Sequence, residues 1–136
     1  MAVSSIHEKM VQAILIWIAE RYENEEQLSV AADCIFAEDL PLPPNIDGYI
    51  PDVYATGLKN KRTIIGEAKT PKDLETPRSR EQIRAFIQHL SNAENPAFII
   101  ATPWMSTNSA KAIVKSIMKR TGISNVDTVI LEKLPI

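Results

Sequence analysis

The chain of 136 residues contains one cysteine and four glycines, and it lacks any long apolar run. The lone Cys34 excludes an intrachain disulfide and a thiolate metal cluster, and it suits a reducing compartment, so we expect a cytoplasmic protein. Four glycines are too few for a glycine-rich phosphate-binding loop. The longest apolar run, residues 13–19, cannot span a bilayer, and the first residues lack the basic start and apolar stretch of a signal peptide.

The chain also lacks an excess of positive charge, since its net charge is -2. Residues 1–58 hold two basic and ten acidic residues, whereas residues 59–84 hold eight basic and four acidic ones. This balance excludes a general nucleic-acid coat protein, whose affinity comes from a large positive excess. It permits a basic surface built from the second half of the chain. The length predicts a single domain over residues 1–136.

Apolar periodicity and turn signals predict eight helices and strands. In chain order, we expect a helix over 5–22, strands over 27–36, 49–55 and 62–70, a helix from Thr76-Pro77, a strand over 97–101, a helix from Ser106 or Thr107 to Gly122, and a strand over 126–132. The order α-β-β-β-α-β-α-β predicts an α/β fold with one mixed sheet flanked by helices, in which an antiparallel meander precedes parallel strands. Cys34 is then a small core residue of the first strand.

Charged residues stand in two of the predicted strands. Asp52 follows Pro51, and Glu67 and Lys69 lie near the end of the next strand on either side of Ala68. Because side chains alternate along a strand, Glu67 and Lys69 share a face, and a hairpin would bring Asp52 beside them. Buried charges are costly, so their presence in apolar strands indicates a purpose. Two carboxylates beside a lysine can hold a divalent cation and the water that it activates.

This arrangement resembles the PD-(D/E)XK, or restriction-endonuclease-like, nuclease superfamily, and within it the Holliday junction resolvase-like members. The resemblance covers roughly residues 5–105 and rests on Pro51, Asp52, Glu67, Ala68 and Lys69 in their element order. It implies a DNA endonuclease that depends on Mg²⁺ or Mn²⁺. In such proteins the Asp and Glu hold the metal, the carbonyl of the residue at Ala68 adds a contact, and the Lys positions or deprotonates the attacking water.

The resemblance also points to two residues on helices. An acidic residue on the first helix often completes the metal site, and Glu8 stands at that position, but Glu8 also matches a capping box with Ser5. Some members add a catalytic glutamine on the helix after the motif. Gln82 is the candidate here, with an ordinary helix-surface role as the alternative.

Two basic groups lie in the second half of the chain. The first surrounds the start of the helix after the motif, and we expect its members to contact DNA phosphates: Lys72, Arg78, Arg80 and Arg84. The second repeats every four residues on the last helix, where a solvated face is favoured: Lys111, Lys115 and Lys119.

Three further polar residues are given ordinary roles by their local sequence. His7 and His89 lie far apart and lack the spacing of metal ligands, so we expect them on the surface or at helix ends. Asp47 competes with Asp52 as a metal ligand, but Asp47-Gly48 is a good turn pair.

A domain this small has little surface for recognition, so we expect a homodimer or a partner subunit, with DNA as substrate and no membrane association. Two alternatives stay open. The chain can be a non-catalytic nuclease-fold subunit that binds DNA or a protein partner. It can also be an α/β interaction protein in which the motif is coincidental, which the acidic first half suits better. The sequence leaves the structure and sequence specificity of a DNA substrate open.

Overall fold

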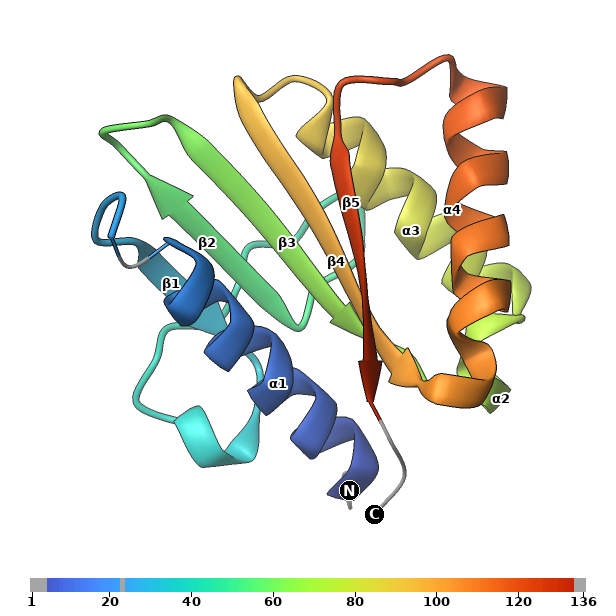
Figure 1. The fold of residues 1–136 in the computed structure, drawn as a ribbon, viewed down its shortest axis with the longest axis horizontal. Coiled ribbons are helices and arrows are strands. Elements are labelled where there is room, and N and C mark those ends of the chain that lie inside the picture. The colour runs from blue at the N-terminus through green and yellow to red at the C-terminus, as the bar shows by residue number, and fades with distance from the viewer. Residues whose placement is uncertain (1–4, 23, 134–136) are drawn as a thin grey trace.

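The computed structural model describes residues 5–22 and 24–133 (Figure 1). Its elements are, in chain order, α1 (Ser5–Tyr22), β1 (Ser29–Ala32), the 3-10 turn η1 (Ile35–Ala37), β2 (Val53–Gly57), β3 (Arg62–Ala68), α2 (Pro71–Leu74), α3 (Pro77–Leu90), β4 (Asn95–Pro103), the 3-10 turn η2 (Trp104–Ser106), α4 (Thr107–Thr121) and β5 (Asp127–Lys133).

The five strands form one sheet in the order β1-β2-β3-β4-β5. β1, β2 and β3 pair antiparallel, and β4 and β5 continue the sheet parallel to β3. The predicted mixed α/β sheet, with a meander followed by parallel strands, is therefore confirmed.

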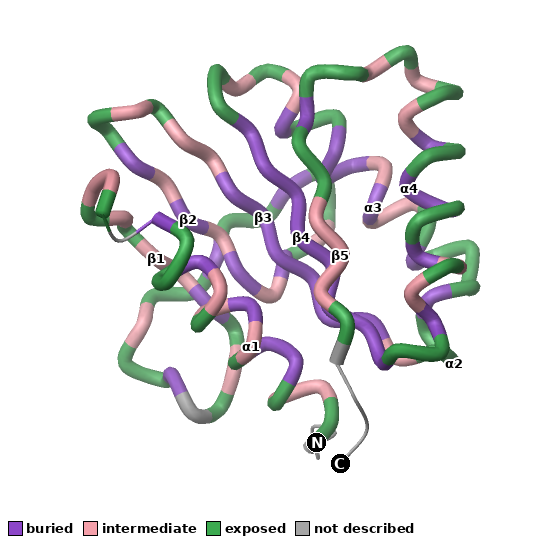
Figure 2. Tube along the Cα trace, viewed as in Figure 1, coloured by how far each residue is buried: buried purple, intermediate pink, exposed green. Residues whose placement is uncertain are grey.

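Each face of the sheet has its own apolar core. On β3, Ile64 packs with the buried residues of α1, and its neighbour Ile65 packs with those of α3 and α4. Figure 1 shows the same layering, with α1 on one side of the sheet and α3 and α4 on the other. Figure 2 shows that burial is greatest along β3 and β4, whereas β1 and β5 are more exposed. Side-chain alternation along the central strands thus fills two cores at once.

Several local signals act as the sequence predicts. The side chain of Thr76 caps α3 by accepting a hydrogen bond from the Ser79 N–H, and Pro77 occupies the first turn. Gly122 ends α4 with φ at 72°, a left-handed conformation that glycine adopts without strain. Asp47 lies in a turn with Gly48, as expected. No helix among residues 5–22 and 24–133 is long and apolar enough to cross a membrane.

The strand boundaries differ from the prediction in the first half of the chain. The strand predicted over 27–36 was too long at both ends, since β1 runs only from Ser29 to Ala32. It ends at Ala32 because its partner strand β2 begins opposite that residue, with Val53. Cys34 is therefore not a strand residue but the half-buried residue before η1. The strand predicted over 49–55 begins only at Val53, because the Asp52 N–H bonds to a side chain, Glu67, and not to a neighbouring strand.

The third strand also ends early, and a short element follows it. β3 stops at Ala68, after which Thr70 caps α2 by accepting a hydrogen bond from the Asp73 N–H. The four residues of α2 are too few to show a helical period, so this helix is absent from the elements that the sequence predicts.

Candidate functional site

The start of β2 and the end of β3 bring Asp52 and Glu67 side by side. The pairing of Val53 with Gly66 sets the register, so Asp52 lies next to Glu67. The Asp52 N–H donates to Glu67 Oε1 at 2.8 Å, and the Ala68 N–H donates to Asp52 Oδ2 at 2.9 Å. Two backbone N–H groups thus orient two carboxyl groups at one edge of the sheet.

Lys69 and Gln82 complete this cluster from the α3 side. Lys69 Nζ lies 3.4 Å from Glu67 Oε2 and donates a hydrogen bond to Gln82 Oε1. Glu67 and Lys69 are only 3% and 6% exposed. A buried ion pair of this kind is not a general source of stability, since desolvation offsets the attraction between the charges. The contact between Glu67 and Lys69 agrees with the prediction that these two side chains share a face, and Lys69 alone of the two bonds to α3 through Gln82.

The environment of Glu67 opposes its negative charge. Burial raises the pKa of this carboxyl, and the neighbouring charge of Asp52 raises it further, to about 8. Lys69 acts in the opposite direction, but its attraction is outweighed. Nearby positive charge, such as a bound cation, would relieve this conflict. Perturbed carboxyl groups of this kind are common at functional sites.

The first turn of α1 adds His7 and Glu8. His7 Nε2 lies 3.3 Å from Asp52 Oδ2 and forms a hydrogen bond with it. Glu8 Oε1 accepts a hydrogen bond from the Ile35 N–H at 2.6 Å, so one of its oxygens holds η1 in place. The side chain of Ser5 lies outside the described residues, and the capping box therefore stays a prediction, as does the role of Glu8 as a ligand.

His7 lies in the first turn of α1, at a helix end as expected, but it also contacts Asp52, which the sequence did not predict. Its hydrogen bond to Asp52 raises the pKa of the imidazole against the lowering effect of burial, and the charges of Asp52, Glu67 and Glu8 raise it further. One signal in the sequence pointed here: His7 is adjacent to Glu8, the residue already placed at the site. His89 does lie near the end of α3, where its Nε2 is 3.1 Å from the Tyr54 hydroxyl.

A close approach of α1 to β3 sets the position of His7 and Glu8. A Cβ atom at Gly66 would lie 2.6 Å from Ile14 Cγ2 and 3.3 Å from Val53 Cβ. Only glycine leaves room for the helix at this distance from the strand. The absent side chain at Gly66 therefore lets α1 come down onto the sheet next to Glu67.

A small cavity of about 260 Å³ opens beside Asp52 on the α1 side. Three residues that line it lie directly after β1, and the sequence did not indicate them as part of the site: Asp33, Cys34 and Ile35. Burial raises the pKa of the Cys34 thiol, with a smaller opposing effect from a backbone hydrogen bond with Ala37.

The donor set suits a hard divalent cation. Among the described residues, no three His, Cys, Asp or Glu side chains are arranged so that they could hold a metal ion. Mg²⁺, however, keeps several waters and often uses only one or two carboxylates. Asp52 and Glu67 would supply those two, and a cation beside Glu67 would oppose the burial and the charge of Asp52 that raise the pKa of its carboxyl. These residues therefore fit Mg²⁺ or Mn²⁺; a contact from the Ala68 carbonyl stays a prediction.

The basic residues predicted to contact DNA differ in their surroundings. Lys72, Arg78 and Arg80 are exposed, and the Arg78 guanidinium lies 5.2 Å from the centre of the Tyr49 ring. Arg84 is instead engaged on α3, where it bonds to Glu81 and Gln88. The first three are therefore free of such pairing with acidic side chains among the described residues, and Arg84 is partly neutralised.

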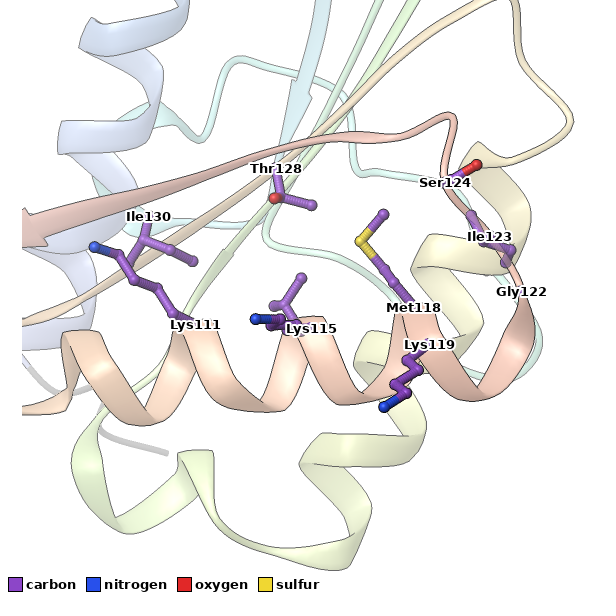
Figure 3. A pocket seen from close by; sticks show the side chains of 10 residues that line it. Lys111, Lys115, Met118, Lys119, Gly122, Ile123, Ser124, Thr128 and Ile130 are labelled. Carbon is purple, nitrogen blue, oxygen red and sulfur yellow. The ribbon is translucent and has the colours of Figure 1, made fainter.

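The lysines of the last helix lie at a separate surface. Lys111, Lys115 and Lys119 line a groove of about 600 Å³ between α4 and β5 (Figure 3). Apolar side chains, among them Met118 and Ile130, complete its walls. The groove shares no lining residue with the carboxylate cluster.

Protein-family models, curated proteins and solved structures give no match to this chain. The chemistry of the protein is therefore inferred from its carboxylate cluster, which is formed by Asp52, Glu67, Lys69, Gln82 and His7.

Proposed function

We propose that this protein is a Mg²⁺- or Mn²⁺-dependent nuclease that hydrolyses phosphodiester bonds in DNA. The observation that carries the proposal is the pairing of Asp52 and Glu67 at one sheet edge, with Lys69 beside them and both Glu67 and Lys69 buried. The strand order and the placement of α1 and α3 on opposite faces agree with restriction-endonuclease-like topology. That topology is part of the proposal.

The residues of the cluster have distinct tasks in this reaction. A bound divalent cation lowers the pKa of a water and polarises the phosphate. Asp52 and Glu67 would hold the cation through their carboxylate oxygens. Lys69, oriented by Gln82, orients the attacking water and offsets negative charge on the phosphate. Hydrolysis then proceeds by direct in-line attack of water, without a covalent enzyme intermediate.

The DNA backbone lies across the basic surface next to the cluster. Lys72 on α2 and Arg78 and Arg80 on the first turn of α3 are exposed and follow Lys69 closely in the chain. Contacts from such residues to phosphates fix the position of a duplex without reading its sequence.

Cleavage of labelled linear, branched and circular DNA, with and without Mn²⁺, tests the proposal. We expect metal-dependent cleavage by the wild type and a loss of at least about 100-fold in Asp52→Asn and Glu67→Gln, because the metal supplies several kcal/mol of transition-state stabilisation. Asp47→Asn is the matched control, since Asp47 is an exposed turn residue outside the cluster, and it should cleave like the wild type.

Two results would contradict this function. Undiminished cleavage by both cluster variants would assign the activity elsewhere. DNA binding by the wild type without cleavage of any substrate would instead favour a non-catalytic nuclease-fold subunit.

A further inference from the structure

We propose that His7 is a positioning residue that orients Asp52 for cation binding, an inference that rests on the proposed function. Its Nε2 atom hydrogen-bonds to Asp52 Oδ2 at 3.3 Å from the first turn of α1. Neither His7 nor this contact belongs to the motif on which the resemblance rests.

The direction of the hydrogen bonds around Asp52 carries the argument. Oδ2 accepts the Ala68 N–H at 2.9 Å and also faces His7 Nε2. A carboxylate oxygen has about two lone-pair positions, so these two donors occupy Oδ2. They leave Oδ1 as the oxygen that turns toward a cation. Hydrogen bonds of this kind to a ligating carboxylate fix its orientation and affect metal affinity.

The surrounding structure holds His7 in place for this task. α1 approaches β3 closely at Gly66, where Ile14 packs against the glycine. Glu8, next to His7, is bonded to the Ile35 N–H on the turn after β1. α1 is therefore held to the sheet at Ile14, and its first turn is held to η1 at Glu8, which keeps the backbone that carries His7 next to Asp52.

A metal-free measurement tests the positioning directly. The Ala68 amide donates to Asp52 Oδ2, so its hydrogen exchange reports whether the carboxylate stays in place. We expect His7→Ala to accelerate Ala68 exchange by about 3- to 10-fold, consistent with a weakened hydrogen bond. His7→Gln retains a side-chain N–H at similar reach and should restore slow exchange.

Mn²⁺ titration by calorimetry supplies the second readout. We expect His7→Ala to weaken Mn²⁺ binding by about 10- to 100-fold, as is typical when a group that orients a metal ligand is removed. His7→Gln should bind within about threefold of the wild type. The matched control is His89→Ala, because His89 is the other histidine of the chain and contacts Tyr54 instead of the cluster.

The outcomes separate this inference from the proposed function. Unchanged Ala68 exchange and unchanged Mn²⁺ affinity in His7→Ala would overturn the positioning role, whether or not the wild type cleaves DNA. Mn²⁺ binding that disappears in His7→Ala and is not restored in His7→Gln would make the imidazole a direct ligand and also overturn it. A wild type that binds no Mn²⁺ would overturn the proposed function and the cation-binding part of the inference, and Ala68 exchange would then decide whether His7 still orients Asp52.

Discussion

At the scale of single residues, Glu67 is the group whose charge fits its surroundings least. Its carboxyl is almost fully buried, lies beside Asp52, and faces Lys69 at 3.4 Å. Burial and the repulsion from Asp52 together outweigh the attraction of Lys69, so its pKa rises to about 8. Protonation of Glu67 is therefore favoured over its ordinary behaviour in the metal-free protein, and a bound cation would favour the ionised form.

The raised pKa of Glu67 gives a pH dependence of stability. Between its ordinary pKa of 4.5 and about 8, the folded state binds a proton at Glu67 that the unfolded chain has released. The stability that this bound proton gives the folded state is therefore fully present below pH 4.5 and is lost as pH rises toward 8. Across this window the free energy of unfolding falls by at most about 1.4 kcal/mol per pH unit. Urea unfolding at several pH values without metal measures it.

The Glu67→Gln variant isolates this effect, because glutamine cannot titrate. His7, whose pKa is also raised, shifts stability in the same direction and stays present in both proteins. The difference in unfolding free energy between wild type and variant should fall with pH across this window. A difference that is constant from pH 5 to pH 8 would show that Glu67 is ionised throughout.

The sequence placed Asp52, Glu67 and Lys69 in the site but did not place His7 there. Asp52, Glu67 and Lys69 could be placed together because alternation and a hairpin are local rules. His7 could not, because its meeting with Asp52 depends on how closely α1 approaches the sheet. That distance is set by packing at Gly66, far from His7 in the chain.

At the scale of secondary-structure elements, the contact between α1 and β3 determines whether the site assembles. Ile14 of α1 rests on Gly66, which precedes Glu67 in β3. A side chain at Gly66 would push the helix that carries His7 and Glu8 away from the strand. Core positions of this kind resist added volume because protein interiors are already close-packed.

A Gly66→Ala substitution should therefore destabilise the protein by about 1–3 kcal/mol, the usual cost of overpacking. Chemical denaturation measures this destabilisation. Combining it with Ile14→Leu, which removes the clashing Cγ2 atom at nearly constant volume, should recover part of the stability. Strictly additive effects of the two substitutions would contradict the packing argument, since residues in direct contact are expected to couple.

Element types were predictable where a period or a cap was strong, and boundaries were not. The buried stripe of α3 and its Thr76-Pro77 start are local features, and both agree with the structure. β1 is shorter than predicted because a strand extends only as far as its partner, and β2 begins at Val53. The residues of β1 alone do not determine where that partner strand begins.

At the scale of the whole molecule, charge is divided between a mostly acidic first half and a basic surface near the cluster. The exposed members of that surface are Lys72, Arg78 and Arg80. Binding to a polyanion releases counterions in proportion to the phosphates neutralised, so these residues should govern the salt dependence of DNA binding. The homodimer or partner subunit expected for so small a chain stays a prediction.

Replacing Arg78 or Arg80 by Ala should weaken duplex binding and lower the slope of log K against log salt by about 0.9 for each phosphate that is no longer neutralised. Fluorescence anisotropy across a salt titration, in Ca²⁺ or without metal, measures both. Lys61→Gln is the control, because Lys61 lies at the opposite end of β3 and pairs with Glu94. Equal slopes for the arginine variants and the wild type would place the DNA elsewhere.

Calorimetric titration of Mn²⁺ into the wild type, Asp52→Asn and Glu67→Gln tests the shared cation site most directly. We expect one Mn²⁺ per wild-type chain, a higher melting temperature on binding, and proton release, because a cation favours the ionised form of a carboxyl whose pKa is raised. Both variants should lose this binding. A wild type that binds no Mn²⁺, or variants that bind it with wild-type affinity, would contradict the assignment of Asp52 and Glu67 as partners in one metal site.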